Sequence, residues 1–355
     1  MKDVMSDSMT PYSDRYRLVR LFDSRLSMLI PRHPLKVVTL LAVMLAAVTL
    51  VALSAGNQWL TPQALWQWLC GDADGATKLI VGQFRLPRIL LALCAGAALG
   101  MSGVLVQSII RNPLASPDIL GINSGAATAV VLFFLFAQQQ IPIVWLPLIA
   151  FAGAALMMLT LLGLSRLLRL KPGQMILAGI GCATLLDAAR SLLVMYAPTW
   201  LLGKSTVWMT GSVHGARFDQ VWLLAGALVL LAPLLIALLR HLTVQLLGEE
   251  TATGLGCALS RWQWAGLMLS AALSALAVGF VGGIGFIALM APHIARRWVG
   301  NQLGFLLVCA ALTGSLLLLI ADTLGRTIMI PLDIPAGVFT AMLGAPYFLY
   351  LLLRR

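Results

Sequence analysis

The tetrapeptide Gly203-Lys204-Ser205-Thr206 has the residue types that end a phosphate-binding loop, in which backbone N–H groups and a lysine hold the phosphates of a nucleotide. A complete loop also needs a glycine five residues before the second one, and Pro198 stands at that position. Because proline has no N–H group and a fixed φ, this segment cannot form the phosphate cradle. We therefore expect a polar connection between two apolar segments here, and no ATP site in this chain.

The other polar residues do not have the spacing of a catalytic or metal site. No carboxylate pair and no Ser/His/Asp arrangement accompanies the four histidines, which stand at positions 33, 214, 241 and 293. The five cysteines show no CxxC or Cys/His spacing, so we interpret them as small apolar side chains without a disulfide framework or zinc site. The sequence therefore predicts no catalytic residue, no metal ligand and no cofactor within this chain.

Composition identifies the class of protein. Of the 355 residues, 60% are hydrophobic and 10% are charged, whereas a soluble domain carries about 25% charged residues. So little polar surface could not cover a soluble fold of this size, and the sequence predicts an all-α polytopic membrane protein. The net charge of +11 would suggest nucleic-acid binding in a soluble protein. Here the placement of the basic residues indicates loops that face anionic membrane lipid, and we expect no nucleic-acid partner.

About ten apolar segments are long enough to be transmembrane helices, since a helical span needs roughly 20 apolar residues. We place them at about 35–55, 88–108, 121–137, 142–165, 174–196, 221–240, 264–282, 282–300, 304–323 and 336–353. The segment 282–300 is short and rich in glycine and proline, so we expect an interior helix that is broken at Pro292. Residues 35–355 form the ten-helix domain, and residues 1–34 form a polar tail, expected to lie partly as an amphipathic helix on the membrane surface.

The distribution of basic residues predicts the orientation of the chain. With the N-terminus in the cytoplasm, most of the 24 Lys and Arg residues lie in the tail, in inner loops or at the C-terminus. This asymmetry follows the positive-inside rule and places both termini in the cytoplasm. The same orientation puts Lys204 on the outer side, where there is no ATP.

Two stretches combine charged residues with small ones. In residues 84–130, Arg85 and Arg88 stand at the outer end of a span, and the small residues that follow predict close helix packing; these are Gly96, Gly100 and Gly103. In residues 246–256, two glutamates after Gly248 predict the start of a short cytoplasmic helix that ends at Gly254 and Gly256. The short helix is either a simple loop element or a lever for a cytoplasmic partner.

Two further stretches carry isolated ionisable residues. His293 follows the proline of "ALMAPHIARRWVG" at a membrane boundary, where a lone histidine is more often structural than a ligand. The C-terminal stretch contains Asp322 and Arg326, and Arg326 is placed to be a third outer arginine. In another span, Asp187 and Arg190 have i,i+3 spacing, which predicts an intramembrane ion pair.

Taken together, these segments resemble the FecCD-type permeases of ABC importers, which carry iron–siderophore complexes or cobalamin. The matching pieces, in the family's order, are "RLPR", "RNPLASPDILG", "GEETATGLG", "GFIALMAPHIARR", "AD..GR" and "LGAPYFLYLLLRR". The resemblance extends from about residue 35 to the C-terminus and is strongest to permeases for ferric siderophores or ferric citrate. Two features differ from the family pattern: the tail is longer than usual, and Gly283 stands where a proline is usual.

The resemblance implies a type II ABC importer permease fold and a set of partners. These are a second permease subunit, two ABC ATPase subunits that bind ATP and Mg²⁺ on the cytoplasmic face, and a periplasmic binding protein that delivers a ferric siderophore across the bacterial inner membrane. It implies binding-protein docking at Arg85, Arg88 and Arg326, although lipid-headgroup anchoring suits Arg88 equally well. It implies coupling to the ATPase at the loop residues Gly248, Glu249, Glu250, Thr251, Ala252, Leu255 and Gly256.

A translocation path for a large polar chelate needs a weakly binding surface, because a tight site would trap the cargo. The residues that we expect along it are Gln107, Asn112, Pro113, Asn123, Ser124, Thr128, Pro292 and His293. Cobalamin or haem remains an alternative cargo within the family. A secondary transporter driven by an ion gradient is a further alternative, although most spans have no charge at their centres.

Overall fold

The computed structural model describes residues 16–21, 26–137, 140–170, 172–197, 199–330 and 332–353. Within them, seven helical segments are long and apolar enough to cross a membrane. They are α2 (Arg32–Ser54), the continuous run of α4 (Gly75–Leu79), η1 (Ile80–Arg85) and α5 (Leu86–Ile110), η4 (Ile143–Trp145) with α7 (Leu146–Leu168), α8 (Pro172–Met195), α10 (Phe218–Gln245), α12 (Leu259–Val281) and α14 (Leu303–Gly325).

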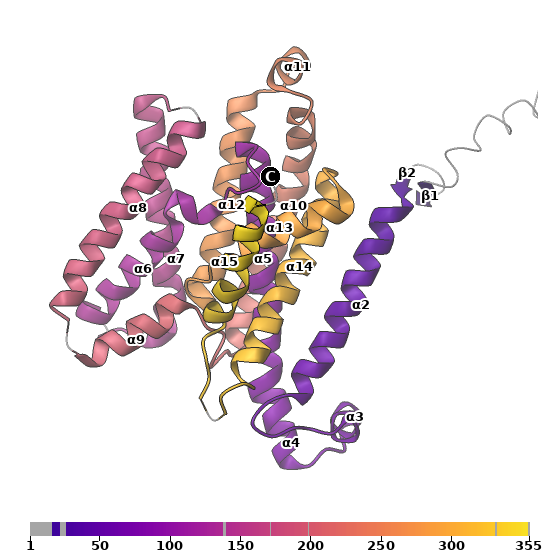
Figure 1. Ribbon diagram of the computed structural model, residues 1–355, viewed down its shortest axis with the longest axis vertical. Coiled ribbons are helices and arrows are strands. Elements are labelled where there is room, and N and C mark those ends of the chain that lie inside the picture. Colours follow the sequence, from indigo (N-terminus) through magenta and orange to yellow (C-terminus); the bar gives the residue numbers. More distant parts are fainter. Residues whose placement is uncertain are drawn as a thin grey trace, which may run out of the picture.

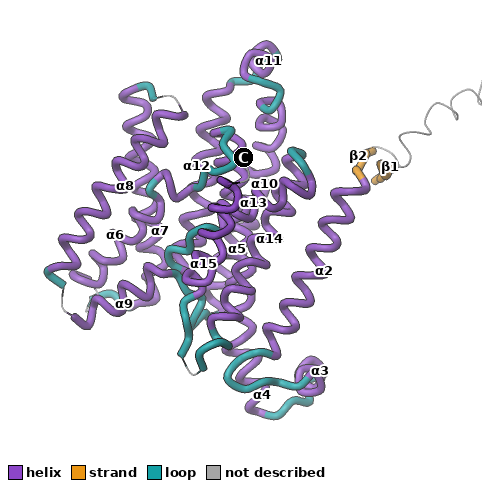
Figure 2. Tube along the Cα trace, in the orientation of Figure 1, coloured by secondary structure: helices purple, strands orange, loops and turns teal. Residues whose placement is uncertain are grey.

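Three shorter helices lie among these long ones and complete, in order, the ten segments expected from the sequence. They are α6 (Ile122–Leu132) with η3 (Phe133–Ala137), α13 (Ile287–Val299) and α15 (Ala336–Leu353). The connections contain four further short helices: α3 (Pro62–Cys70), η2 (Pro117–Leu120), α9 (Thr199–Thr210) and α11 (Glu249–Gly254). The helical architecture predicted from composition is therefore confirmed (Figures 1 and 2).

The N-terminal tail differs from the expected surface helix in its described part. Residues Tyr16–Leu21 (β1) and Leu26–Pro31 (β2) pair as an antiparallel hairpin, with Tyr16 opposite Pro31. Both runs are mainly apolar and each contains one β-branched residue, and pairing satisfies their backbone hydrogen bonds. Helix α2 follows directly at Arg32, slightly before the predicted start of the first span. Residues 1–15 of the predicted tail lie outside the described residues.

Helix α5 forms the centre of the molecule, and α10, α12, α13 and α14 surround it (Figure 1). Its glycines make this packing possible, because a side chain on any of them would collide with a neighbouring backbone. Gly96 faces Gly314 and Gly100 faces Ala310, both on α14, while Gly103 faces Ala288 on α13. The close packing predicted for these glycines is confirmed.

The break expected at Pro292 is located elsewhere. Helix α12 ends at Val281, the chain turns through Gly282 (φ 76°) and Phe286 (φ 68°), and α13 then continues through Pro292. Proline deprives the carbonyl of Ala288, four residues earlier, of its usual helical donor. That carbonyl packs against Gly103 of α5, so the proline is accommodated by a close helix contact and does not break the helix.

The ends of the bundle differ in what they carry. Figure 1 shows the hairpin, α11 and the C-terminal end of α15 towards one end, and α3 and α4 at the other. The start of α2 and the end of α15 therefore lie on the same side, as an even number of crossings requires. We call the first end the α11 end and the second the α4 end.

Candidate functional site

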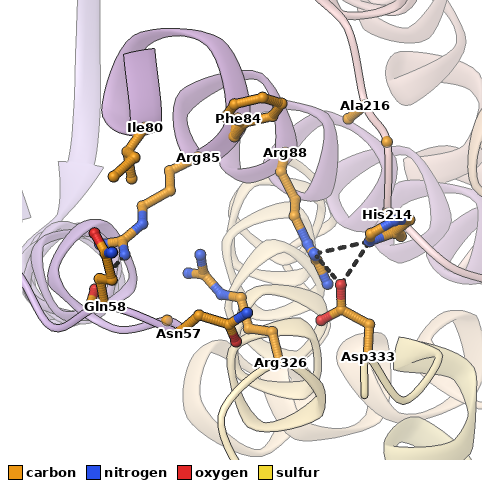
Figure 3. A pocket seen from close by; sticks show the side chains of 12 residues that line it. Asn57, Gln58, Ile80, Phe84, Arg85, Arg88, His214, Ala216, Arg326 and Asp333 are labelled. Carbon is orange, nitrogen blue, oxygen red and sulfur yellow. Dashed lines mark hydrogen bonds and ion pairs between the residues drawn. The ribbon is translucent and has the colours of Figure 1, made fainter. Parts of the chain in front are cut away.

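Three arginines converge at the α4 end. Arg85 ends η1, Arg88 lies in the first turn of α5, and Arg326 caps the C-terminus of α14. They line one cavity of about 510 Å³, together with His214 and Asp333 (Figure 3). We call these five residues and Asp322 the arginine cluster. The sequence indicated that the three arginines share one side, and the structure brings them into one site.

Arg88 is held by two carboxylates. Its Nη2 lies 2.8 Å from Oδ1 of Asp322, and its Nε donates to the same carboxylate at 2.9 and 3.1 Å. Its Nη1 lies 3.2 Å from Oδ2 of Asp333. The side chain of Asp322 is only 1% exposed, so this fork joins α5 to α14 in an environment nearly free of water.

The other two arginines cap the end of α2. Arg85 donates from Nη1 to the carbonyl oxygens of Leu53 and Ser54, at 2.5 and 2.9 Å, and from Nη2 to Gln58. Arg326 donates from Nη2 to the carbonyl of Ala52. The last carbonyls of a helix have no partner within it, and they also carry the negative end of its dipole. Two guanidinium groups therefore fix α2 to α5 and α14.

The arginines themselves present little surface. Arg85, Arg88 and Arg326 are 6%, 8% and 6% exposed. The outward-facing members of the arginine cluster are His214 and Asp333, whose side chains are 65% and 33% exposed and whose Nδ1 and Oδ2 atoms lie 2.6 Å apart. Sequence reasoning missed both, because they stand in separate loops that only the fold brings together. Docking by the arginines remains a prediction.

The loop between α10 and α12 forms the predicted short helix, α11. It begins after Gly248 (φ 109°), carries Glu249 and Glu250 in its first turn, and ends at Gly254. Ala252 is fully buried and anchors it, whereas Leu255 is 65% exposed. Thr251 and Gly256 are also exposed, so they belong with Leu255 to the accessible surface of this loop. Figure 1 shows α11 projecting beyond the ends of α10 and α12, where a partner can reach it.

Arg111 connects α11 with the centre of the molecule. It caps the C-terminus of α5 in the left-handed conformation (φ 55°). Its Nη2 donates to the carbonyl of Gln245 at 3.0 Å, and its Nη1 lies 3.9 Å from Oε1 of Glu249. One side chain therefore joins α5, α10 and α11. From the sequence, Arg111 was recognisable only as a basic residue on the inner side. Its contacts could not be predicted, because both partners lie more than 130 positions away in the chain.

The residues expected along a translocation path fall into separate places. Asn123 and Ser124 line a cavity of about 220 Å³ with Asp187 and Arg190, and Gln107 and Pro113 line another of about 160 Å³ near α11. Thr128 is buried and donates its hydroxyl to the carbonyl of Ser124, and Asn112 accepts the N–H of Leu114 within its own turn. Pro292 is buried, and His293 packs edge-on against Tyr347. The structure thus groups Asn123 with Ser124 and Gln107 with Pro113, and a path shared by all eight residues remains a prediction.

One ion pair and one hydrogen-bonded carboxyl group lie beside these path residues. The predicted pair between Asp187 and Arg190 is present, at 3.1 Å. Asp118, in η2, accepts hydrogen bonds from Asn123 at 2.6 Å and from Ser116 at 3.2 Å. Burial raises the pKa of the Asp118 carboxyl to about 6, and the hydrogen bond from Ser116 opposes that shift. The amide of Asn123 is therefore engaged by a neighbouring carboxyl group.

The tetrapeptide 203–206 lies within helix α9 and not in the expected polar connection. Its N–H groups belong to a helical backbone, which cannot curl around phosphates. In the part of the chain that the structure describes, no group of three or more His, Cys, Asp and Glu side chains is placed to hold a metal ion.

Comparison with known proteins assigns the chain to a family. The model of the FecCD transport family matches residues 44–354. The Fe(3+)-citrate import system permease protein YfmE of Bacillus subtilis is 42% identical over 90% of this chain and 96% of its own length. The vitamin B12 import system permease protein BtuC of Salmonella typhi is 35% identical over 88% of this chain and 94% of its own.

A solved structure, described as an inward-facing conformation of an ABC transporter of the metal-chelate type, superimposes with a TM-score of 0.80. It is 30% identical and covers 90% of this chain and 99% of that one. One family model thus matches nearly the full length of this chain. The matched range contains the short helix α11 at one end of the bundle and the buried arginines at the other. This chain belongs to the FecCD transport family of membrane permeases.

Proposed function

We propose that this chain is the membrane-spanning subunit of an ABC importer that carries a ferric chelate of the siderophore or citrate type into the cytoplasm. The observation that carries the proposal is the 42% identity to a ferric citrate permease over nearly the full length of both chains. Cobalamin is the second candidate cargo, because a vitamin B12 permease is 35% identical over a similar range.

The assembly that we propose follows from the two ends of the bundle. A second permease subunit pairs with this one, two ATPase subunits bind the α11 end, and a periplasmic binding protein docks at the α4 end. The chain then lies in the bacterial inner membrane with both termini in the cytoplasm, and ATP and Mg²⁺ are bound by the partner subunits. The start of α2 and the end of α15 on one side of the bundle support the placement of both termini on the same face, and the distribution of basic residues supports the cytoplasm as that face.

Helix α11 is proposed as the contact through which ATP binding changes the permease. A ligand shifts an equilibrium between two conformations only by its different affinity for them, so the ATPase must hold α11 differently in each state. An acidic first turn, a buried Ala252 and an exposed Leu255 give α11 a fixed base and an accessible surface. Glu249→Lys combined with Gly248→Trp is expected to abolish both ATPase association and transport.

At the α4 end, we propose that the binding protein docks at the opening of the cavity that the arginine cluster lines, which we call its mouth. The three guanidinium groups are buried and neutralised only in part by Asp322 and Asp333, so the mouth has a positive potential that attracts acidic side chains. His214 and Asp333 make the first contacts because they are the exposed members. Because Arg85 and Arg88 also hold the bundle together, the docking test uses the exposed member of the cluster: His214→Glu is expected to lower uptake, and retained basal ATP hydrolysis will show that the complex still assembles.

Uptake of radioactive ferric citrate, a ferric siderophore and cobalamin into membrane vesicles that contain the whole transporter tests the proposed function. Vanadate is expected to stop ferric chelate uptake, and an uncoupler is expected to leave it unchanged. Uptake of cobalamin but of neither ferric chelate would show that cobalamin is the cargo. Uptake that is stopped by the uncoupler but not by vanadate would indicate a secondary transporter.

A further inference from the structure

An apolar groove lies at the α4 end, where its rim residue Arg217 follows the loop that carries His214 of the arginine cluster. It is formed by the first turns of α7 and α10 and the last turns of α12, and its volume is about 490 Å³, within the range of roughly 300–1,000 Å³ typical of ligand pockets. Its walls are large apolar and aromatic side chains: Trp145, Leu148, Phe151, Leu223, Leu276 and Phe280.

The groove opens towards the space that the bilayer occupies. Leu148 is 54% exposed and Leu223 is 65% exposed, and both lie on helices that are long and apolar enough to cross a membrane. In such helices an exposed apolar wall contacts acyl chains, since no water is present at that depth. Phe280 and Phe151 are partly buried and form the base of the groove.

Opposite charges stand at the rim of this groove. Nε of Arg217 lies 3.0 Å from Oδ1 of Asp219, and the two side chains are 61% and 44% exposed. This contact uses one edge of the guanidinium group and one carboxylate oxygen, so Nη1, Nη2 and Oδ2 can still face a ligand. Trp145, half exposed beside them, has the amphipathic ring that is typical of the membrane–water boundary.

We propose that this groove binds one acyl chain of phosphatidylethanolamine, with the lipid phosphate at Arg217 and its ammonium group at Asp219. The pair of charges matches a zwitterionic headgroup that can donate hydrogen bonds. An anionic headgroup without an amine leaves Asp219 facing negative charge, and a choline headgroup offers Asp219 no N–H donor.

Photocrosslinking tests this site directly. The purified chain is placed in nanodiscs that contain phosphatidylethanolamine, phosphatidylglycerol or phosphatidylcholine with a photoactivatable acyl chain, and the labelled peptides are identified by mass spectrometry. We expect label in residues 144–151 and 276–280, about fivefold more from phosphatidylethanolamine than from the other two lipids. Equal labelling by the three lipids, or label absent from these segments, would overturn the proposal.

Two variants separate the groove from its rim. Ala227→Trp fills the groove from α10, and we expect it to remove the label; Val229→Trp is the matched control, since Val229 is 72% exposed and lies outside the groove. Arg217→Glu leaves the walls intact and is expected to lower phosphatidylethanolamine labelling about fivefold. Undiminished labelling of either Ala227→Trp or Arg217→Glu, in protein that elutes and melts like the wild type, contradicts the assignment.

Discussion

Replacing Arg88 by methionine tests whether the arginine cluster holds the bundle together. The substitution keeps an unbranched apolar stem but removes three contacts of 2.8 to 3.1 Å to Asp322, whose side chain is 1% exposed. The nearest remaining cation is Arg326, with its Nε 4.0 Å from Asp322. Breaking a buried ion pair on one side costs about 3–5 kcal/mol, and we expect about 3 kcal/mol because Arg326 compensates in part.

The assay is the free energy of unfolding of the purified chain in detergent, measured by denaturant titration. Arg217→Met is the matched control, because the exposed pair of Arg217 and Asp219 contributes only about 0–1 kcal/mol. The double variant Arg88→Met/Asp322→Leu removes both buried charges, so we expect it to regain at least about half of the stability that Arg88→Met loses.

A loss below about 1 kcal/mol in Arg88→Met, no larger than that of the control, would refute this reasoning. Arg88 would then be a dispensable surface charge, whose role lies in docking alone. A double variant that is less stable than Arg88→Met would also refute it, because the buried carboxylate would then be stable without its partner.

Three further outcomes are expected. Arg111→Ala should reduce cargo imported per ATP hydrolysed about two- to tenfold, because α5 loses its hydrogen bond to α10 and its ion pair with α11; unchanged transport in reconstituted vesicles would contradict this. Asp118→Asn should reduce the pH dependence of stability. The pKa of Asp118 is raised from 3.8 to about 6, so this group makes the wild type lose roughly 3 kcal/mol as pH rises from about 3 to 7, and denaturant titrations at those two pH values must show a correspondingly smaller loss in the variant. Gly100→Ala should lower the free energy of unfolding by about 1–3 kcal/mol, because the new Cβ meets the carbonyl of Ala310. Gly163 has open space around it, so Gly163→Ala should leave the stability unchanged. Equal melting temperatures of the two variants would contradict this packing argument.

Features set by neighbouring residues could be predicted from the sequence. Apolar length located the helices, the acidic turn after Gly248 located α11, and i,i+3 spacing located the pair of Asp187 and Arg190. The glycines of α5 were recognisable as packing residues because a series of small residues on one helix has few other uses.

Features set by distant residues could not be predicted. The close packing around Pro292 depends on Gly103, which lies on another helix and leaves space for the carbonyl of Ala288. The contact of His214 with Asp333 joins two loops that are far apart in the chain. The burial of Arg85 depends on the end of α2, and nothing in the sequence around Arg85 indicates that end.

The central claim is that this chain is a passive conduit and that separate ATPase subunits supply the energy. Its most direct test is accumulation of ferric chelate in liposomes that contain this chain with its permease partner and the binding protein, with and without the ATPase subunits and ATP. We predict accumulation against a gradient only when the ATPase subunits and ATP are present. Accumulation without them would contradict the account.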